Sequence, residues 1–329
     1  MDCTYMAGVR CVGTAVCQKR KCMKVSLILT CFNEVENIGA LMSDVLKQGQ
    51  IPDEMVIVDA GSQDGTLTVL REFEPKFLEK GSLLTLHVAT GASIAHGRNL
   101  AIEIARHEVL AVTDAGCHLD PNWLAKITAP ILCGDADLVG GFFLPVAKSR
   151  FQRVLASLTT ANAPGRAFFP SSRSVAFRKS TWERAGRYPE WLKWGEDTYF
   201  NTQCLTAGAR YCVAADAIVH WEVRRTWGQV FKQFRRYAFG DGLARRFTPS
   251  LAAAPAVYGV ALIGLLAGYP AVMVVVPLLG IGWVLRKPGI PLKDGLYAVG
   301  LAVTIQAARA VGYVVGRLSS TDVAKAEQE

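Results

Sequence analysis

The feature that most constrains this fold is a repeated order of apolar run, polar loop and helical stripe between residues 25 and 114. The strand-like runs are Val25–Thr30, Met55–Val58, Leu83–Val88 and Val109–Thr113. Helical stripes of apolar residues follow over residues 38–46, around 67–73 and near 99–106. Strands that alternate with helices in this way pair in parallel, because each helix carries the chain back to the start of the next strand. The sequence therefore predicts an α/β fold with a mostly parallel sheet flanked by helices.

Polar side chains stand at the predicted carboxyl ends of these strands. They are Asn33, Glu34, Asp59, Asp64 and Asp114. Ligands of open α/β sheets bind at this edge. Asn33 is also placed to cap the following helix, with Glu36 as its capping-box partner. The sequence has no GxGxxG and no GxxxxGK[ST] motif, so neither a dinucleotide fingerprint nor a P-loop explains the pattern.

Three charged residues near this edge each have two interpretations. Asp59 can accept hydrogen bonds from a base or ribose, or simply cap its own loop. For Asp64, in the turn that ends at Gly65, capping fits at least as well as ligand contact. We expect Arg98 in a loop after a strand, where its guanidinium binds a diphosphate by paired hydrogen bonds or remains a solvated surface group.

The run Trp194–Phe200 places two adjacent carboxylates at the start of a helix, where the helix dipole stabilises their charge. Capping alone explains one of them. The aromatic residues of the run offer a surface for a sugar ring, and a carboxylate that faces an acceptor hydroxyl can act as general base. We therefore expect Asp197 to be the base and Glu196 to bind or orient the acceptor.

Five segments in this order resemble the family 2 glycosyltransferases. They are Cys31–Glu34, Val58–Thr66, Gly97–Asn99, Thr113–Gly116 and Gly195–Asp197, and the resemblance covers about residues 23–242. It implies the GT-A fold, a nucleotide-diphosphate sugar as donor and an inverting single displacement with Asp197 as base. Asp59 is then on the nucleotide and Asp114 at the metal and diphosphate. The full set expected to bind the donor is Phe32, Asn33, Glu34, Asp59, Asp64, Arg98 and Asp114.

The metal motif departs from the family pattern. The family usually has Asp-x-Asp, whereas Gly116 stands at the second acidic position here. In the related polyprenyl-phosphate sugar synthases a polar residue two positions further can coordinate the cation, and here that residue is His118. His220, after a predicted strand at 217–219, is another candidate ligand, and both histidines can equally be hydrogen-bonded structural residues. The resemblance implies Mg²⁺ or Mn²⁺ held by Asp114.

A second, shorter similarity lies further along the chain. Residues 233–237 resemble the Gln-x-x-Arg-Trp motif of membrane-bound processive synthases, with tyrosine in place of tryptophan. Basic aromatic runs also occur at membrane surfaces, so the motif has two interpretations. The residues expected on the acceptor or membrane side are Trp194, Gln233, Arg235, Arg236 and Tyr237.

The apolar content of 51% is high for a soluble enzyme, and the excess follows Ser250. Leu251–Leu285 carries no charged residue and exceeds the ~20 residues that one spanning helix needs. Basic residues flank it on both sides, which favours a hairpin of two spans with both ends cytoplasmic over one long kinked span. Gly295–Gly316 is a third apolar stretch that spans the bilayer, packs on the hairpin or lies in the interface.

These features divide the chain into five parts. We expect a disordered leader at 1–22, a catalytic domain at 23–222, a basic interfacial helical segment at 223–247, a hydrophobic membrane region at 248–318 and a polar tail at 319–329. The first residues contain no continuous apolar run typical of a signal peptide, so we expect a cytoplasmic catalytic domain on a multi-pass membrane protein. The nine cysteines lack paired spacing and are expected to be mostly reduced.

The predicted function is sugar transfer to a hydroxyl or phosphate acceptor, either lipid-linked or a growing glycan at the membrane. The net charge of +8 suits nucleotide phosphate or anionic lipid. Nucleic acid is disfavoured, because the basic residues cluster beside the membrane segment. A nucleotidyltransferase lacks its glycine-rich phosphate loop here. A catalytically silent sugar-nucleotide-binding membrane protein would explain Gly116, but Asp197 beside Glu196 argues for catalysis.

Overall fold

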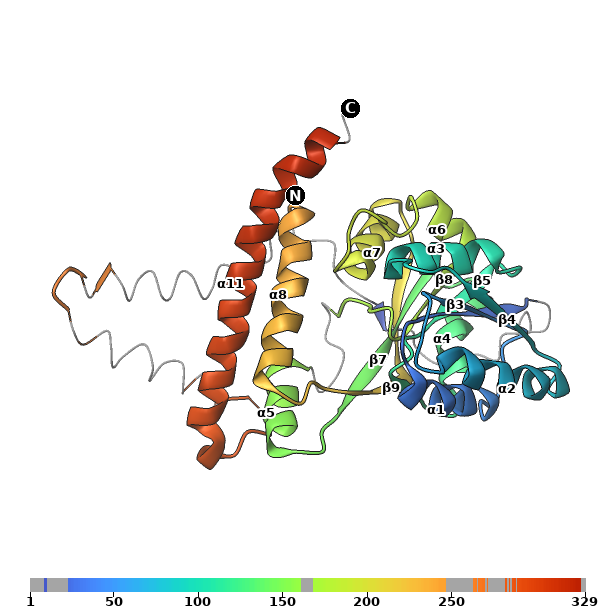
Figure 1. Cartoon of the computed structure of the whole chain (residues 1–329), viewed down its shortest axis with the longest axis horizontal. Helices are drawn as coiled ribbons and strands as arrows, with labels where there is room; N and C mark the ends of the chain where they lie inside the picture. The colour runs from blue at the N-terminus through green and yellow to red at the C-terminus, as the bar shows by residue number, and fades with distance from the viewer. Residues whose placement is uncertain are drawn as a thin grey trace. The chain divides into compact units, whose positions relative to one another are not determined.

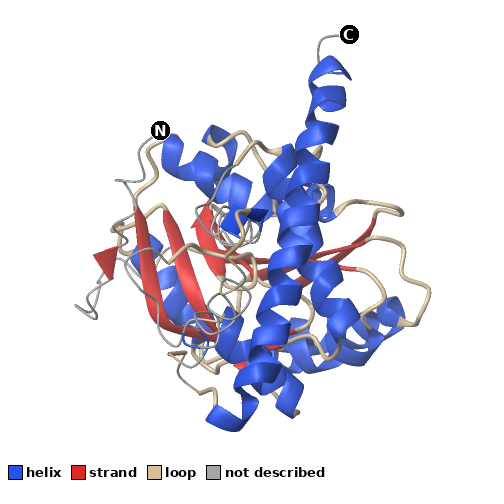
Figure 2. Ribbon diagram, turned by 90° about the vertical axis from the view of Figure 1, so that its left-hand side faces the viewer, coloured by secondary structure: helices blue, strands red, loops and turns tan. Residues whose placement is uncertain are grey.

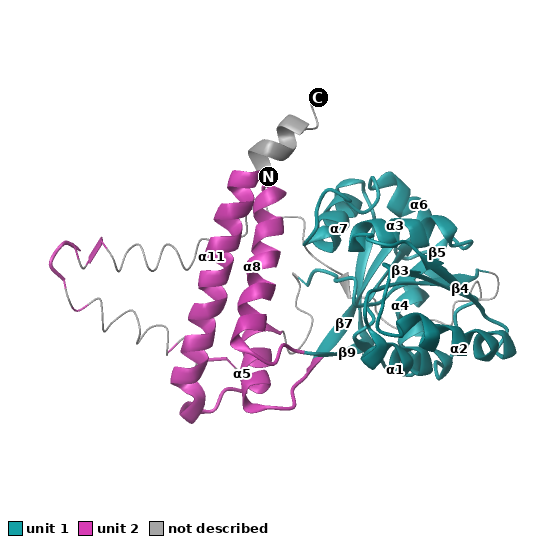
Figure 3. Ribbon diagram, in the orientation of Figure 1, with its two compact units in different colours: residues 1–144, 161–222 teal, residues 145–160, 223–329 magenta. Residues whose placement is uncertain are grey.

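The computed structural model describes residues 9–10, 23–160, 168–246 and 289–326, together with isolated positions between 263 and 287. The chain forms two compact units (Figure 3). Unit 1 comprises Met1–Leu144 and Ala161–Glu222, and unit 2 comprises Pro145–Thr160 and Val223–Glu329. Residues 145–160 of the catalytic domain expected over 23–222 therefore belong to unit 2. Most of the leader and of the hairpin expected at Leu251–Leu285 lies outside the described residues.

Unit 1 is built on one mixed sheet. Its strands are β1 (Val9–Arg10), β2 (Val25–Cys31), β3 (Glu54–Asp59), β4 (Leu83–Val88), β5 (Val109–Val112), β6 (Cys117–Leu119), β7 (Leu138–Val146), β8 (Val175–Arg178) and β9 (Tyr211–Glu222). They run in the order β1-β9-β7-β8-β5-β2-β3-β4, with β6 paired to β9. β2 to β5 pair in parallel, whereas β8 is antiparallel to β5 and to β7. The predicted α/β fold is confirmed, and its parallel part is the segment read from the sequence.

Two strands differ from expectation. Residues 9–10 of the expected disordered leader form β1, which pairs with Cys212 and Val213 of β9. The short strand expected at 217–219 is part of β9, one continuous strand of 12 residues. Cys31, Cys117 and Cys204 are free thiols, whereas Cys212 is disulfide-bonded.

Helices cover both faces of this sheet (Figures 1 and 2). They are α1 (Val35–Leu46), α2 (Thr66–Glu79), α3 (Ile94–Ile104), α4 (Trp123–Leu132), α6 (Lys179–Arg184) and α7 (Glu196–Thr206). Successive side chains of a strand point to opposite faces. Leu27 and Leu29 of β2 accordingly pack with α1, α2 and α4, whereas Ile28 packs with α3, α6 and α7. The strands are buried on both sides, which fixes their register and the position of the loops at their ends.

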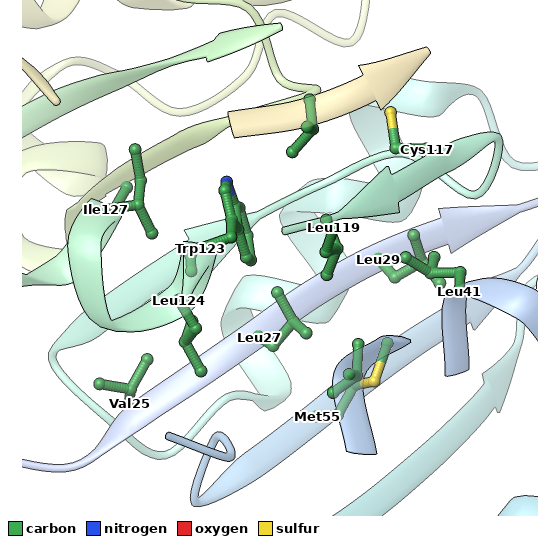
Figure 4. Packing of buried hydrophobic residues seen from close by; sticks show 14 of the residues in the cluster. Val25, Leu27, Leu29, Leu41, Met55, Cys117, Leu119, Trp123, Leu124 and Ile127 are labelled. Atoms are coloured by element: carbon green, nitrogen blue, oxygen red, sulfur yellow. The ribbon is translucent and has the colours of Figure 1, made fainter. Parts of the chain in front are cut away.

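The core on the first face is shown in Figure 4. Leu27 and Leu29 of β2 lie with Leu41 of α1 and with Trp123 of α4, and all four are at most 1% exposed. Burial of each such side chain contributes about 1.5–3 kcal/mol. The indole Nε1 of Trp123 donates to Ser174 Oγ at 2.8 Å, so the one polar atom of this ring is satisfied.

The strand order determines where a ligand binds. From β2 the chain adds β3 and then β4 on one side, and β5 returns to the other side of β2. The carboxyl ends of β2 and β5 therefore form the point where the winding direction reverses, which is where open α/β sheets bind ligands. Cys31 at the end of β2 is in register with Asp59 at the end of β3. Three of the predicted polar loops thus meet at one edge.

The described residues of unit 2 form the helices α5 (Arg150–Thr159), α8 (Trp227–Leu243) and α11 (Gly295–Ala326), with the short helix η3 (Leu292–Asp294) before α11. The Arg150 guanidinium pairs with Asp294 at 2.6 Å. The Trp227 ring makes edge contacts with Phe151 and Tyr297, with centroids 5.7 and 5.5 Å apart. These contacts join α5, α8 and the start of α11.

α8 and α11 run side by side in the same direction (Figure 1). Glycines allow their backbones to touch. A Cβ at Gly312 would collide with the carbonyl oxygen of Arg235, and one at Gly316 would collide with that of Phe239. Close approach through glycines four residues apart is typical of helix pairs in membranes. In the part of the chain that the structure describes, Leu292–Ser319 alone is long and apolar enough to cross a membrane.

We expect Gly312→Ala to destabilise unit 2, because the added methyl has no space against the Arg235 carbonyl. The matched control is Gly300→Ala in the same helix, where the new Cβ lies 3.5 Å from the Trp227 ring, an ordinary contact. Alanine is favoured over glycine in a helix by about 1 kcal/mol, so the control should be neutral or stabilising. Thermal unfolding of the full chain in detergent checks this. A melting temperature for Gly312→Ala at or above that of Gly300→Ala would show that the helices do not touch there.

Candidate active site

Asp59 ends β3 and is 1% exposed. Its Oδ1 accepts hydrogen bonds from the backbone N–H groups of Gly61 (2.9 Å) and Ser62 (2.7 Å). Its Oδ2 accepts from Ser62 Oγ at 2.5 Å and from Cys31 Sγ at 3.3 Å. Both oxygens therefore shape the turn that follows β3. Burial raises the pKa of the Cys31 thiol far above its usual range, and the Asp59 carboxylate raises it further.

Hydrogen bonds join the loop after β2 to the loop after β3. Asp64 Oδ2 accepts from the N–H of Val35 at 3.0 Å, and Asp64 Oδ1 accepts from Thr66. The expected cap at Asn33 is wrong: α1 begins at Val35, and Asn33 has φ 54° and accepts instead from the N–H of Gln63. The Thr66 hydroxyl and the Val35 and Thr66 N–H groups lower the pKa of Asp64. Asp64 thus caps helix starts, as one of its two interpretations predicted.

Two expected donor residues lie on the exposed side of these loops. The Phe32 ring is 56% exposed. Glu34 accepts from Asn37 Nδ2 at 2.9 Å.

Nearby, an open hollow of about 450 Å³ is lined by residues 89–93 and His96. It adjoins β3, because Ala89 N–H donates to the Asp59 carbonyl at 2.8 Å. The edge thus offers an open space bounded by an exposed ring and a polar turn.

The sequence predicted Arg98 in a loop, but the structure places it in helix α3. Ser93 caps α3 by accepting from the His96 N–H, so the helix begins at Ile94 and buries Arg98 to 4% exposed. Its Nη2 donates to Asp114 Oδ1 at 2.8 Å, and its Nη1 donates to Glu196 Oε1 at 2.7 Å. Burial lowers the pKa of Arg98, but the two carboxylates raise it by more, so the net shift is upward. The guanidinium therefore joins the loop after β5 to the start of α7.

Glu196 and Asp197 open α7, whose N-cap is Gly195 at φ 80°. Glu196 is buried, and burial raises its pKa to about 7 although Arg98 opposes the shift. Asp197 is partly exposed. Its Oδ1 accepts from the Thr198 N–H at 2.7 Å, whereas its Oδ2 has only longer contacts of 3.4 Å with Ser171 Oγ and the Ser172 N–H. Oδ2 of Asp197 is therefore the more available carboxylate oxygen.

Several site residues were missed in the sequence. Asn99 receives hydrogen bonds from Trp182 Nε1 and the Tyr188 N–H, and it donates to Tyr188 and Glu190. It thereby holds the segment that leads to α7. The turn at residues 171–174 contacts Asp197, and its Arg173 carbonyl accepts from Thr113 Oγ1 at 2.9 Å. Asn99 belongs to a motif that was found, whereas the Ser171–Arg173 turn matches none of the motifs in the sequence and reaches the site through contacts with distant segments.

The expected metal ligands do not form a site of three ligands, although His118 and His220 are register partners on β6 and β9. His118 Nδ1 lies 3.2 Å from Asp44, and His220 Nε2 lies 2.9 Å from Asp120. Among the residues that the structure describes, no group of three or more His, Cys, Asp or Glu side chains is arranged to hold a metal ion. Asp114 is the one expected ligand beside Arg98 and α7, with a side chain 39% exposed.

The residues expected on the acceptor side fall in both units. Trp194 precedes α7, and its ring lies 5.5 Å from the Lys193 ammonium. Gln233, Arg235, Arg236 and Tyr237 lie on α8 in unit 2. Gln233 Nε2 donates to Tyr237 Oη at 3.0 Å, one helical turn apart. The helix expected over part of 223–247 is present, and a role for these residues stays a prediction.

This chain is similar to known proteins in sequence and in fold. Residues 26–213 match the family model described as Glycosyl transferase family 2. Glycosyltransferase AglE of Haloferax volcanii is 27% identical over 219 residues, 64% of this chain and 71% of that protein. The O-antigen chain rhamnosyltransferase RfbN of Salmonella typhimurium is 23% identical over 241 residues, 69% of this chain and 74% of that protein.

Two solved structures match over nearly the whole chain. Mannosyltransferase PcManGT from Pyrobaculum calidifontis, in complex with GDP-Man and Mn²⁺, has a TM-score of 0.54 at 19% identity and covers 91% of this chain and 87% of its own. S. aureus TarS 1-349 in complex with UDP-GlcNAc has a TM-score of 0.51 at 18% identity, with 92% of each chain covered. These likenesses support the GT-A fold. With a family match over more than half of its length, the chain belongs to glycosyl transferase family 2.

Proposed function

We propose that this protein transfers a sugar from a nucleotide-diphosphate sugar to a hydroxyl or phosphate acceptor with inversion at the anomeric carbon. The observation that carries the proposal is the connected set Asp114–Arg98–Glu196, with Asp197 beside Glu196, at the edge where the winding of the sheet reverses. One carboxylate is tied to a buried cation, and the neighbouring one keeps an available oxygen. This difference suits Glu196 as a positioning group and Asp197 as the base.

The donor is proposed to lie along the ends of β2, β3 and β4. The hollow at residues 89–96 accommodates the nucleoside, and the exposed Phe32 ring offers it an apolar face. Asp59 keeps the turn in shape and meets the nucleotide where the turn opens. The structural neighbours that bind GDP-Man and UDP-GlcNAc support a nucleotide-diphosphate sugar as the class of donor.

Asp197 acts as the base in this proposal. The acceptor oxygen attacks the anomeric carbon while Asp197 Oδ2 takes its proton, and the bond from that carbon to the diphosphate oxygen breaks on the opposite face. The nucleoside diphosphate leaves with the electron pair of that bond. Arg98 fixes Glu196 next to Asp197 and so holds the start of α7 in place. A catalytically silent binder would have no need for this arrangement.

A divalent cation fits this site only in part. Mg²⁺ binds through one or two carboxylates plus substrate phosphates, and Asp114 supplies one carboxylate where Gly116 supplies none. Asp114 would hold Mg²⁺ or Mn²⁺ together with the diphosphate of the donor, as the Mn²⁺ of the mannosyltransferase neighbour suggests. The cation would offset the charge of the leaving diphosphate.

We further propose that unit 2 attaches the enzyme to a membrane. The exposed face of α11 is a stripe of Leu296, Val303, Val311, Val314 and Leu318, spaced three to eight residues apart along one side of the helix. Lys232 and Arg235 are exposed on α8, which is packed along α11. Charges at bilayer depth cost several kcal/mol, so the pair is better placed in the interface than across the membrane.

The acceptor follows from this placement. An active domain tethered at a membrane meets a lipid-linked acceptor or a growing glycan more often than a soluble sugar. A hairpin of two spans over Leu251–Leu285, with both ends and the catalytic domain in the cytoplasm, would complete the attachment. Donor and lipid would then be the partners, and nucleic acid would not.

Asp197→Asn should leave donor binding nearly intact and lower turnover roughly 100-fold or more, the usual scale for loss of a general base. Release of nucleoside diphosphate by the full chain measures it. Asp216→Asn is a matched control, because its carboxylate is 72% exposed on β9 and pairs with Lys126 at 3.8 Å. Turnover near that of the wild type would remove Asp197 from the mechanism.

Glu196 should make stability depend on pH. Its pKa is raised from 4.5 to about 7 by burial, so the folded state holds the proton between these values while the unfolded state releases it. Stability is therefore lost as pH rises through this window. Between pH 5 and 8 the melting temperature of the wild type should fall by more than that of Glu196→Gln. Parallel pH curves for the two proteins would refute the buried, proton-retaining state of Glu196.

Activity should require Mg²⁺ or Mn²⁺, and Asp114→Ala should abolish the response to added cation, because it removes the carboxylate expected to hold the ion. Asp44→Ala, which removes the partner of His118, should keep that response. Full activity in the presence of a chelator would show that other cationic groups alone offset the diphosphate charge.

The full chain should sediment with membranes and need detergent for release. Leu296→Glu should weaken binding of the purified chain to vesicles that contain anionic phospholipid, because it places a negative charge on the apolar stripe. Leu78→Glu is the matched control, since Leu78 is 73% exposed on α2 and Leu296 is 77% exposed on α11. Recovery of the full chain in the soluble fraction without detergent would contradict the attachment.

A further inference from the structure

A turn between β7 and β8 brings a second arginine to the candidate site. The Ser174 N–H donates to the Ser171 carbonyl at 2.9 Å, which closes a four-residue turn with Arg173 in its third position. The Arg173 carbonyl accepts from Thr113 Oγ1, next to Asp114, and the Ser171 side of the turn contacts Asp197. Arg173 thus belongs to the segment that lies between the two proposed functional carboxylates.

Aromatic rings hold the Arg173 guanidinium. Its central carbon lies 4.4 Å from the centroid of the Trp221 ring and 5.6 Å from that of Phe143. Its Nη1 lies 3.2 Å from Ser171 Oγ. Stacking on an aromatic face restricts the plane of a guanidinium and therefore the directions of its N–H donors. The charge is therefore presented in a fixed orientation from a partly buried position.

The loop after β5 contacts the turn that carries Arg173, because Thr113 Oγ1 donates to the Arg173 carbonyl at 2.9 Å. Gly116 within it carries no side chain, and a Cβ built there would meet nothing within 4 Å. Where the family pattern has a second carboxylate, this chain has no side chain and open space.

We propose that Arg173 binds the diphosphate of the nucleotide-sugar donor. The inference rests on the proposed function, because it assumes that the donor lies at this edge. A guanidinium bonds phosphate oxygens through two parallel N–H donors, and this adds direction as well as charge. Arg173 supplies positive charge on the side where Gly116 leaves the cation with one carboxylate, and it remains with the leaving nucleoside diphosphate after transfer.

The test compares nucleotide binding by the full chain in detergent with Mn²⁺ present, with UDP, UMP, GDP and GMP as probes. Arg173→Ala should weaken binding of the preferred nucleoside diphosphate about tenfold or more and that of its monophosphate less, as expected for lost hydrogen bonds to a charged group. Arg173→Lys should retain part of the affinity, because it keeps the charge. Arg178→Ala is the matched control. Arg178 is the last residue of β8, whereas Arg173 lies in the turn before this strand, and Arg178 pairs with Asp137.

Diphosphate affinity in Arg173→Ala and Arg173→Lys equal to that of the wild type would overturn the inference and leave the proposed function standing. A higher KM for a phosphate acceptor alone would also overturn it, because the arginine would then serve the acceptor. A wild-type chain that binds neither UDP nor GDP would refute the proposed donor and the inference with it. Melting temperatures identify a variant that fails to fold, and Arg173→Lys then decides the question.

Discussion

The buried guanidinium of Arg98 is the constraint on which the candidate site depends. It lies in α3 at 4% exposure and bonds Asp114 from one loop and Glu196 from the start of α7. Removing one partner of a buried ion pair costs about 3–5 kcal/mol, so Arg98, Asp114 and Glu196 stabilise one another in these positions. Because the loop after β5 and the start of α7 are far apart in sequence, this single side chain fixes the distance between the proposed diphosphate carboxylate and the proposed base.

Much of this could be predicted from the sequence where periodicity is strong. The strands from Val25 to Val112 follow from apolar runs, and the order of five motifs indicates the family that the comparisons confirm. The role of Arg98 could not be predicted in the same way. Its helix starts at a Ser93 cap rather than at an apolar stripe, and two carboxylates distant in sequence decide that its charge is buried.

Caps and turns limited the prediction for similar reasons. Asn33 has the residue type of an N-cap, but α1 is capped across the loop by Asp64, a contact between segments that local patterns do not contain. His118 and His220 have the residue type of metal ligands, yet each is bonded to an aspartate outside the site. Arg173 was missed for the opposite reason: rings from β7 and β9 and a backbone bond to Thr113 bring it to the site.

The central claim is that Arg98 organises a sugar-transfer site, and its most direct test is turnover of Arg98→Lys. The full chain is offered UDP- and GDP-sugars with lipid phosphates and soluble saccharides, and the release of nucleoside diphosphate is measured. We expect the wild type to release it from at least one donor. Arg98→Lys should be slower by about 100-fold, because an ammonium group cannot bridge the two carboxylates as a planar fork does, and small displacements of catalytic groups have costs of this size. Equal turnover of the two proteins, or no release by the wild type from any donor, would contradict the account.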